Sequence, residues 1–191
     1  RNYGVCPDVA LSGDFLFSIQ AGGGFRIFDV ADPIDPQLLG VVTTGGSPSR
    51  LETAGNLLCV IVSSSVWLYD ISDPAAPAFL VELESVERAH DVAFKDNFLL
   101  VAGSYQDQLA VFDLTYPSAP NLVATAAEGG GPWMVTIAGD YAYVGDDKFG
   151  AEFRIFDIAD LPAITEVATL PMPESVGDCA VLDGVAYVAG G

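Results

Sequence analysis

One phrase returns four times in this chain of 191 residues. It reads FRIFDVADPIDP at residues 25–36, VWLYDISDPAAP at 66–77, AVFDLTYPSAP at 110–120 and FRIFDIADLPAI at 153–164. The aspartates that end its apolar part are 41, 43 and 44 residues apart: Asp29, Asp70, Asp113 and Asp157. Such a period indicates a repeat architecture in which each repeat is one supersecondary unit.

A second marker recurs with the same period. SGDF, AGNL, KDNF, AGDY and LDGV begin at residues 12, 54, 95, 138 and 182 and hold the same place in five successive units. Their Gly, Asp and Asn pairs favour two-residue hairpin turns, where both central residues can adopt positive φ. Each unit therefore reads as four strands. In the first unit the predicted strands are 9–12, 15–19, 25–30 and 37–43.

The repeated phrase is interpreted as the corner between the third and fourth strands. An Asp at a strand end can accept a hydrogen bond from the backbone amide two residues on, which forms an Asx-turn. Pro33, Pro74 and Pro117 then fix φ and prevent the strand from continuing. We therefore expect the four aspartates of this corner to be structural rather than catalytic.

The strands are apolar on both faces, as in LLCVIV and FLLVA, and no segment shows a useful helical period. A sheet that is buried on both faces needs neighbours on both sides. The sequence therefore predicts an all-β chain, a β-propeller of four-stranded antiparallel blades, with four full blades and half of a fifth. We place the blades at about 5–46, 47–87, 88–130, 131–174 and 175–191, the last being partial. They would form a single propeller domain or a segment of a larger one.

These units resemble the LVIVD-repeat β-propellers. The FDxxDPxxP phrase and its upstream hairpin carry the resemblance over essentially the whole chain. The third repeat departs from the pattern at Tyr116, and the fourth repeat has DIADLPAI at its corner. The resemblance implies a secreted or cell-surface protein and implies no general enzymatic activity.

The charge balance is strongly acidic, with 26 Asp and Glu against 7 Lys and Arg and a net charge of −19. Such a surface repels phosphate backbones, so we expect no nucleic-acid partner. The longest apolar run, 57–62, is far short of the ~18 residues that span a bilayer, so we expect no direct membrane insertion. No cofactor is expected, and calcium is left open because carboxylates collect divalent cations.

Three cysteines with no CxxC spacing predict neither a zinc site nor a disulfide framework. Cys59 lies inside an apolar run and is interpreted as a small buried hydrophobe. Cys6 and Cys179 lie near strand starts, and pairing with other parts of the protein is left open for both.

Propellers bind ligands where loops of several blades converge on one face. Two sets of positions lie there: the loops between second and third strands, and the residues at which the chain enters each blade. The entry pairs are Pro7-Asp8, Ser49-Arg50, His90-Asp91, Trp133-Met134 and Gly177-Asp178. The candidate binding residues on these two sets are Asp8, Arg50, His90, Asp91, Trp133, Asp178, Tyr105, Asp146 and Asp147.

The entry aspartates Asp8, Asp91 and Asp178 permit two interpretations. We expect each to cap the start of an inner strand through backbone amides. The alternative is a partial ring of carboxylates, with Arg50 among them, that holds a cation. Asp146 and Asp147 are expected to lie in a solvated acidic loop.

His90 is the single histidine and has no sequence motif for a nucleophile or a second metal ligand around it. We expect it to bond to backbone groups. Trp133 could stack on a sugar or on a side chain of a partner, or it could fill a gap between two blades.

The sequence favours a non-enzymatic binding or scaffolding module that takes a protein or a glycan at one face, with no catalytic residues. Further blades or domains of the same protein are also expected as partners. Two alternatives stay open. One is a structural subunit of a surface layer or filament, and the other is a metal-dependent hydrolase or lactonase that uses channel carboxylates.

Overall fold

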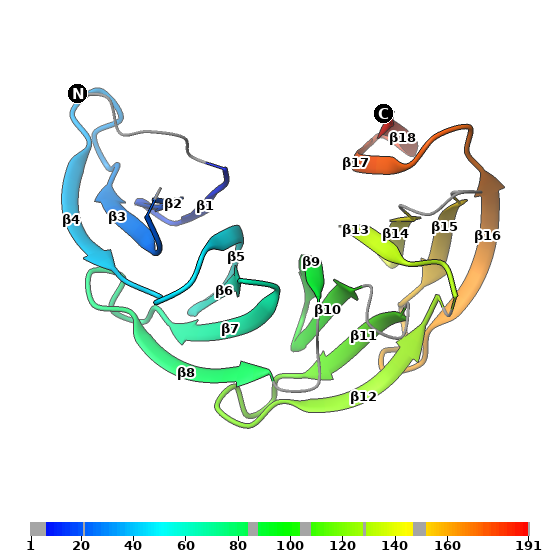
Figure 1. Cartoon of the computed structure of the whole chain (residues 1–191), viewed down its shortest axis with the longest axis horizontal. Helices are drawn as coiled ribbons and strands as arrows, with labels where there is room; N and C mark the ends of the chain where they lie inside the picture. The colour runs from blue at the N-terminus through cyan, green and yellow to red at the C-terminus, as the bar shows by residue number, and fades with distance from the viewer. Residues whose placement is uncertain are drawn as a thin grey trace. The chain divides into compact units, whose positions relative to one another are not determined.

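The computed structural model describes residues 7–20, 22–83, 88–103, 108–127, 129–146 and 152–190. Its regular structure in these ranges consists of β-strands in five antiparallel sheets (Figure 1). The chain divides into two compact units: unit 1 is Arg1–Leu83 and unit 2 is Glu84–Gly191. The described ranges contain no helix that is long and apolar enough to cross a membrane.

Unit 1 holds two four-stranded sheets. The strands of the first are β1 (Val9–Ser12), β2 (Phe15–Ile19), β3 (Phe25–Asp29) and β4 (Gln37–Val42). The strands of the second are β5 (Pro48–Ala54), β6 (Leu57–Val62), β7 (Ser65–Asp70) and β8 (Ala78–Leu83).

Unit 2 holds two four-stranded sheets and one two-stranded sheet. The third sheet has β9 (Ala89–Lys95), β10 (Phe98–Gly103), β11 (Gln108–Asp113) and β12 (Asn121–Ala126). The fourth has β13 (Pro132–Ala138), β14 (Tyr141–Asp146), β15 (Glu152–Asp157) and β16 (Thr165–Pro171). The fifth has β17 (Val176–Leu182) and β18 (Val185–Gly190).

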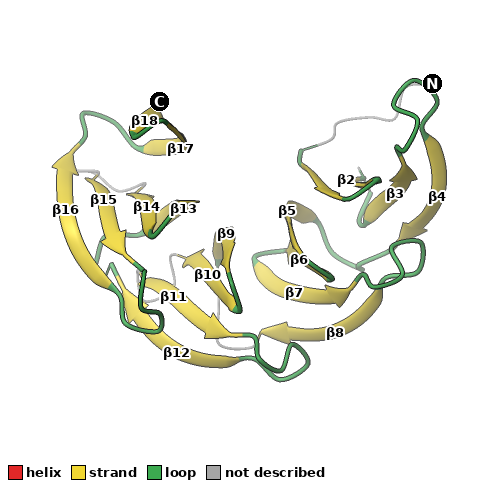
Figure 2. Ribbon diagram, turned by 180° about the vertical axis from the view of Figure 1, so that it is seen from behind, coloured by secondary structure: helices red, strands yellow, loops and turns green. Residues whose placement is uncertain are grey.

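In every four-stranded sheet the strands pair in chain order, so each repeat is an antiparallel meander (Figure 2). This confirms the four strands predicted for each repeat. The first two strands of the first repeat lie where the sequence predicts them. The next two, β3 and β4, each end one residue earlier than predicted.

The two-residue turns between first and second strands explain the Gly, Asp and Asn pairs. The first central residue has positive φ in four turns, from 51° at Asp96 to 61° at Gly139. In the fifth turn both Asp183 and Gly184 have positive φ. Positive φ carries little steric cost for Gly and is tolerated by Asp, which is why these residues recur there.

The core of unit 1 lies between its two sheets. Phe17, Phe25 and Ile27 of the first sheet pack with Leu58 and Tyr69 of the second. All residues of β6 after Leu57 are buried, which confirms that this central strand is apolar because both of its faces are covered. Cys59 is fully buried there as a free thiol, as predicted.

Unit 2 has two apolar layers. Leu100 and Val111 of the third sheet pack with Val144 and Phe156 of the fourth. A smaller layer joins the fourth sheet to the fifth through Met134, Phe153, Val176 and Cys179. The inner strands β9, β13 and β17 are in contact in that order, so each sheet of the unit follows its predecessor face to face.

Candidate functional site

Asp91 joins two neighbouring sheets of unit 2. Its Oδ1 accepts a hydrogen bond from its neighbour Val92 N at 3.0 Å, which caps β9. Its Oδ2 accepts one from Val135 N of β13 at 2.9 Å. The carboxylate is 6 % exposed and uses both oxygens on backbone amides. A buried carboxylate bonded in this way is poorly placed to take a proton from a substrate.

Asp8 makes the same connection in unit 1. Its Oδ1 accepts from Val9 N at 2.9 Å, and its Oδ2 accepts from Leu51 N of β5 at 2.8 Å. Asp178 caps β17 through a bond from Cys179 N at 2.8 Å. These contacts confirm the expected bonds to backbone amides, with Asp8 directly before β1 and with Asp91 and Asp178 as the third residues of β9 and β17. The bonds from Asp8 and Asp91 to the next sheet were missed by the sequence analysis.

The second residue of the inner strands β5, β9, β13 and β17 is bulged out of the ladder, whereas β1 pairs without a bulge. In β9 this residue is His90, in β13 it is Trp133, and the partner strands skip both. A bulge turns a side chain away from the regular in–out alternation. In unit 1 the corresponding residue of β5 is Ser49, so the aromatic pair is particular to unit 2.

His90 and Trp133 stack on one another. Their ring centroids are 4.0 Å apart and their planes differ by 27°. Trp133 remains 40 % exposed, and His90 is half-buried. This stacked pair is here called the aromatic platform. The bond from Val135 N to Asp91 holds together the two strands that carry it.

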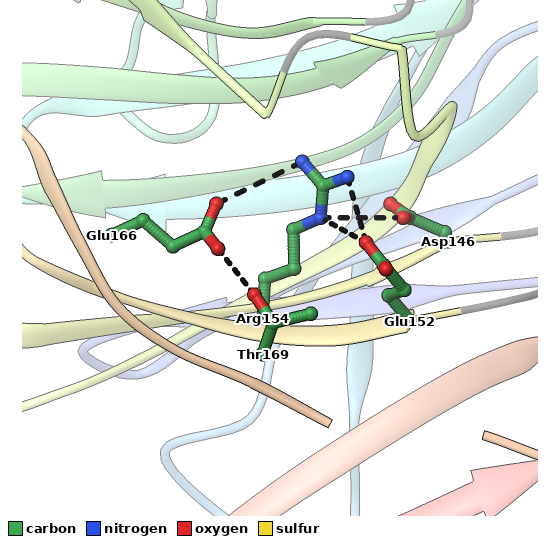
Figure 3. Close-up of polar contacts among 5 residues, drawn as sticks. All are labelled: Asp146, Glu152, Arg154, Glu166 and Thr169. Carbon is green, nitrogen blue, oxygen red and sulfur yellow. Dashed lines mark hydrogen bonds and ion pairs between the residues drawn. The ribbon is translucent and has the colours of Figure 1, made fainter. Parts of the chain in front are cut away.

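The expectation of a solvated acidic loop is wrong for Asp146. This residue ends β14 and is 2 % exposed. Arg154 explains the burial, because its Nε lies 3.6 Å from Asp146 Oδ2 (Figure 3). A buried carboxylate needs such a counter-ion.

Arg154 is the centre of a wider cluster on the fourth sheet. Its Nε and Nη2 donate to Glu152 Oε2 at 3.0 and 2.8 Å, and its Nη1 lies 3.9 Å from Glu166 Oε2 (Figure 3). Glu166 also accepts a hydrogen bond from Thr169 Oγ1. The cluster ties β14, β15 and β16 together through one guanidinium and three carboxylates.

The remaining candidates are placed as follows. Arg50 is half-buried in β5, directly before the Leu51 amide that bonds to Asp8. Tyr105 and Asp147 lie outside the described residues. In the ranges that the structure describes, no three His, Cys, Asp or Glu side chains gather in a way that could hold a metal ion.

The corner aspartates form the predicted Asx-turns. Asp29, Asp70, Asp113 and Asp157 each accept a hydrogen bond from the backbone amide two residues on, at 2.7–3.0 Å. Bonds from the Ser72 backbone amide and then its side chain hold the pKa of Asp70 below its ordinary value. Bonds from the Thr115 side chain and then its backbone lower the pKa of Asp113. These are structural roles, as expected.

The sequence analysis missed a second group of residues that could contact a ligand. Trp67, Tyr69, Phe79 and Glu82 line a cavity in unit 1. The alignment of the repeats could have pointed to Trp67, because VWLYD carries this residue where two other repeats carry Arg in FRIFD.

Consecutive four-stranded meanders with a fixed corner define a β-propeller built from sequence repeats, as predicted. The family model described as the LVIVD repeat matches residues 4–44, 45–84, 88–127 and 129–170. The chain belongs to the LVIVD repeat family. No curated protein matches the sequence.

Solved structures share the fold at low sequence identity. A protein from Lactobacillus plantarum aligns with a TM-score of 0.82 and 15 % identity over 96 % of this chain and 63 % of its own. A putative 6-phosphogluconolactonase from Bacteroides uniformis ATCC 8492 aligns with a TM-score of 0.82 and 14 % identity over 96 % of this chain and 64 % of its own.

The computationally designed Ika8 protein aligns with a TM-score of 0.76 and 14 % identity over 98 % of this chain and 56 % of its own. The present chain thus spans less than two thirds of each of these three proteins. At such identities the likeness concerns the fold alone.

Proposed function

We propose that this chain is a non-enzymatic binding module of a secreted or cell-surface protein, and that it holds a protein or glycan partner on the aromatic platform. The observation that carries the proposal is Trp133, which is 40 % exposed yet fixed by stacking on His90. A large aromatic side chain that is held rigid loses little conformational entropy on binding, and such residues dominate binding energetics.

The proposed location outside the cell rests on the resemblance of the repeats to the LVIVD-repeat propellers and on the acidic surface. Abundant carboxylates keep an exposed protein soluble. They also favour partners with positive charge near the contact, because complementary charge speeds encounter.

The test is a binding screen with wild-type protein and two variants. Immobilised glycans and peptides would be probed with the wild type, with Trp133→Ala and with Tyr116→Ala, which removes an exposed ring from a corner of unit 2. We expect at least one ligand to be retained by the wild type and by Tyr116→Ala and to be lost by Trp133→Ala. Equal retention by Trp133→Ala would contradict the proposal.

A structural role in a surface layer or filament is the second candidate. The last strand of each four-stranded sheet carries exposed apolar side chains, among them Leu38 and Val41 on β4 and Val167 and Leu170 on β16. Exposed apolar surface of this kind marks interaction sites when it is contiguous. Light scattering over a range of protein concentrations would test this, because a layer or filament subunit must assemble as its concentration rises.

The catalytic alternative, a hydrolase or lactonase, would rely on Asp8, Asp91 and Asp178. The first two already use both carboxylate oxygens on backbone amides. Turnover of a lactone that is lost in Asp91→Asn but kept in Trp133→Ala would favour this alternative over the binding module.

A further inference from the structure

A cavity of about 550 Å³ lies in unit 1, between the segment that follows β4 and the outer half of the second sheet. Its aromatic lining residues are Trp67, Tyr69 and Phe79. Glu82 is the single charged residue among the described residues that line it, and no lysine or arginine does. We call it the acidic aromatic pocket.

A bulge in β8 brings Phe79 and Glu82 to the same face. Residues three apart in a regular strand point to opposite faces. Here Tyr69 pairs with Phe79 and Trp67 pairs with Glu82, while Leu80 is bulged out between them. Directly opposed residues of an antiparallel pair share a face. All four side chains of the pocket therefore project from one side of the second sheet.

The three rings support one another. The Phe79 centroid lies 5.4 Å from that of Trp67 and 5.5 Å from that of Tyr69, both in edge-to-face geometry. Tyr69 is in turn fixed against Phe25 of the first sheet, at 5.4 Å. Phe79 is 52 % exposed, so a ring that is open to solvent is nevertheless held in place.

The lining favours a positively charged group. The face of an aromatic ring attracts cations, Trp most strongly, and a neighbouring carboxylate adds to the attraction. A sugar would need several hydrogen-bonding groups, but Thr44 Oγ1 already donates to Gly46 O at 3.1 Å. The Trp67 Nε1 is buried without a hydrogen-bond partner among the described residues, so the indole offers carbon surface rather than its N–H.

On the corresponding face of the fourth sheet, a positively charged side chain is held among carboxylates. Counted from the corner aspartate, Arg154 holds the place of Trp67, Glu166 that of Phe79 and Thr169 that of Glu82. The guanidinium of Arg154 lies there among carboxylates. In the second sheet Trp67 takes the place of Arg154, and Glu82, at the place of Thr169, supplies a carboxylate.

We propose that the acidic aromatic pocket binds a lysine ammonium or an arginine guanidinium on a partner polypeptide. The charged head lies against Glu82 and the ring of Trp67, and the apolar stem packs on Phe79. The net charge of −19 draws basic segments towards the chain. This pocket lies in unit 1 and is independent of the aromatic platform, so either proposal can fail alone.

The test uses acetylated, amidated pentapeptides, Gly-Gly-X-Gly-Gly, with X as lysine, arginine or norleucine. Binding to the whole chain would be followed by calorimetry and by Trp fluorescence. We expect the lysine or arginine peptide to bind about 10-fold more tightly than the norleucine peptide. Phe79→Ala should weaken that binding about 10-fold. Glu82→Gln should weaken it several-fold and flatten its dependence on salt.

Asp14→Asn is the matched control, because it removes one exposed charge from unit 1 and converts the Gly13-Asp14 turn into the Gly-Asn pair that the next repeat carries. Its affinity should equal that of the wild type, and the melting temperatures of all variants would confirm that they fold. Four outcomes would overturn the proposal: equal binding of norleucine, no binding of any peptide, an equal effect of Asp14→Asn and Glu82→Gln, or butylammonium binding as tightly as the peptides.

Discussion

Asp91 and Val135 lie 44 residues apart in the chain, yet the Oδ2 of the first accepts a 2.9 Å hydrogen bond from the backbone amide of the second. Asp8 and Leu51 repeat this relationship in unit 1 over 43 residues. Asp8 and Asp91 therefore each link two successive sheets. This structural use accounts for an aspartate at these two entry positions.

Removing the Asp91 link should destabilise unit 2. Asp91→Ala leaves the amides of Val92 and Val135 without their acceptors in a buried setting, so we expect a loss of about 1–3 kcal/mol. Asp178→Ala is the comparison, because Asp178 is exposed and caps Cys179 alone in the contacts that the structure gives. Urea unfolding of both variants would measure the difference. Equal effects would contradict the importance of the link.

Replacing Arg154 should be costly because it removes a counter-ion from the buried carboxylate of Asp146. We expect Arg154→Met to lose about 3 kcal/mol of the free energy of unfolding. The double variant Asp146→Asn/Arg154→Met should recover part of this loss, because it removes the second charge as well. Denaturant unfolding at neutral pH would show it. If Arg154→Met were as stable as the wild type, the cluster would contribute no stability.

The corner aspartates predict a loss of stability in acid. The pKa values of Asp70 and Asp113 are lowered in the folded chain, so their contribution is present above the unfolded pKa of about 4 and is lost as pH falls through the folded values. In Asp70→Asn/Asp113→Asn the amide can still form the turn, but it does not titrate. We expect its melting temperature to fall less than that of the wild type between pH 5 and 2. Identical slopes would be evidence against this account.

Cys179 should react slowly with thiol reagents. It is buried in the layer between the fourth and fifth sheets, and burial first, then the neighbouring Asp178 charge, raises its pKa. Little thiolate is then present near neutral pH, and thiolate is the reactive form. In a Cys6→Ser background, iodoacetamide labelling of the native chain should be much slower than labelling in urea, where both remaining thiols are exposed. Comparable rates would contradict the burial of Cys179.

Local features of this fold follow directly from the sequence. The two-residue turns and the Asx-turn at Asp70 depend on residues within a few positions of one another, so a local pattern can reveal them. The repeat period is visible when the chain is aligned on itself. The burial of β6 on both faces is equally visible in its unbroken apolar run. These features are enough to predict the all-β class and the blades.

The features that the sequence analysis missed depend on register between strands. Asp146 is buried because Arg154 lies on the next strand within reach of it, and no local pattern records that distance. Phe79 and Glu82 share a face because Leu80 is bulged out, which reverses the alternation that a regular strand would have. The bonds of Asp8 and Asp91 to neighbouring sheets likewise require the spatial order of the repeats.

The most direct test of whether the entry aspartates link sheets rather than hold a cation is differential scanning calorimetry with calcium, magnesium and a sodium chloride control. A cation that binds the native state raises the melting temperature in a saturable way. We predict that calcium and magnesium shift it no more than sodium chloride of equal ionic strength, and that Asp91→Asn lowers it in every buffer. A saturable rise with calcium that disappears in Asp91→Asn would contradict this account and support a metal-dependent enzyme.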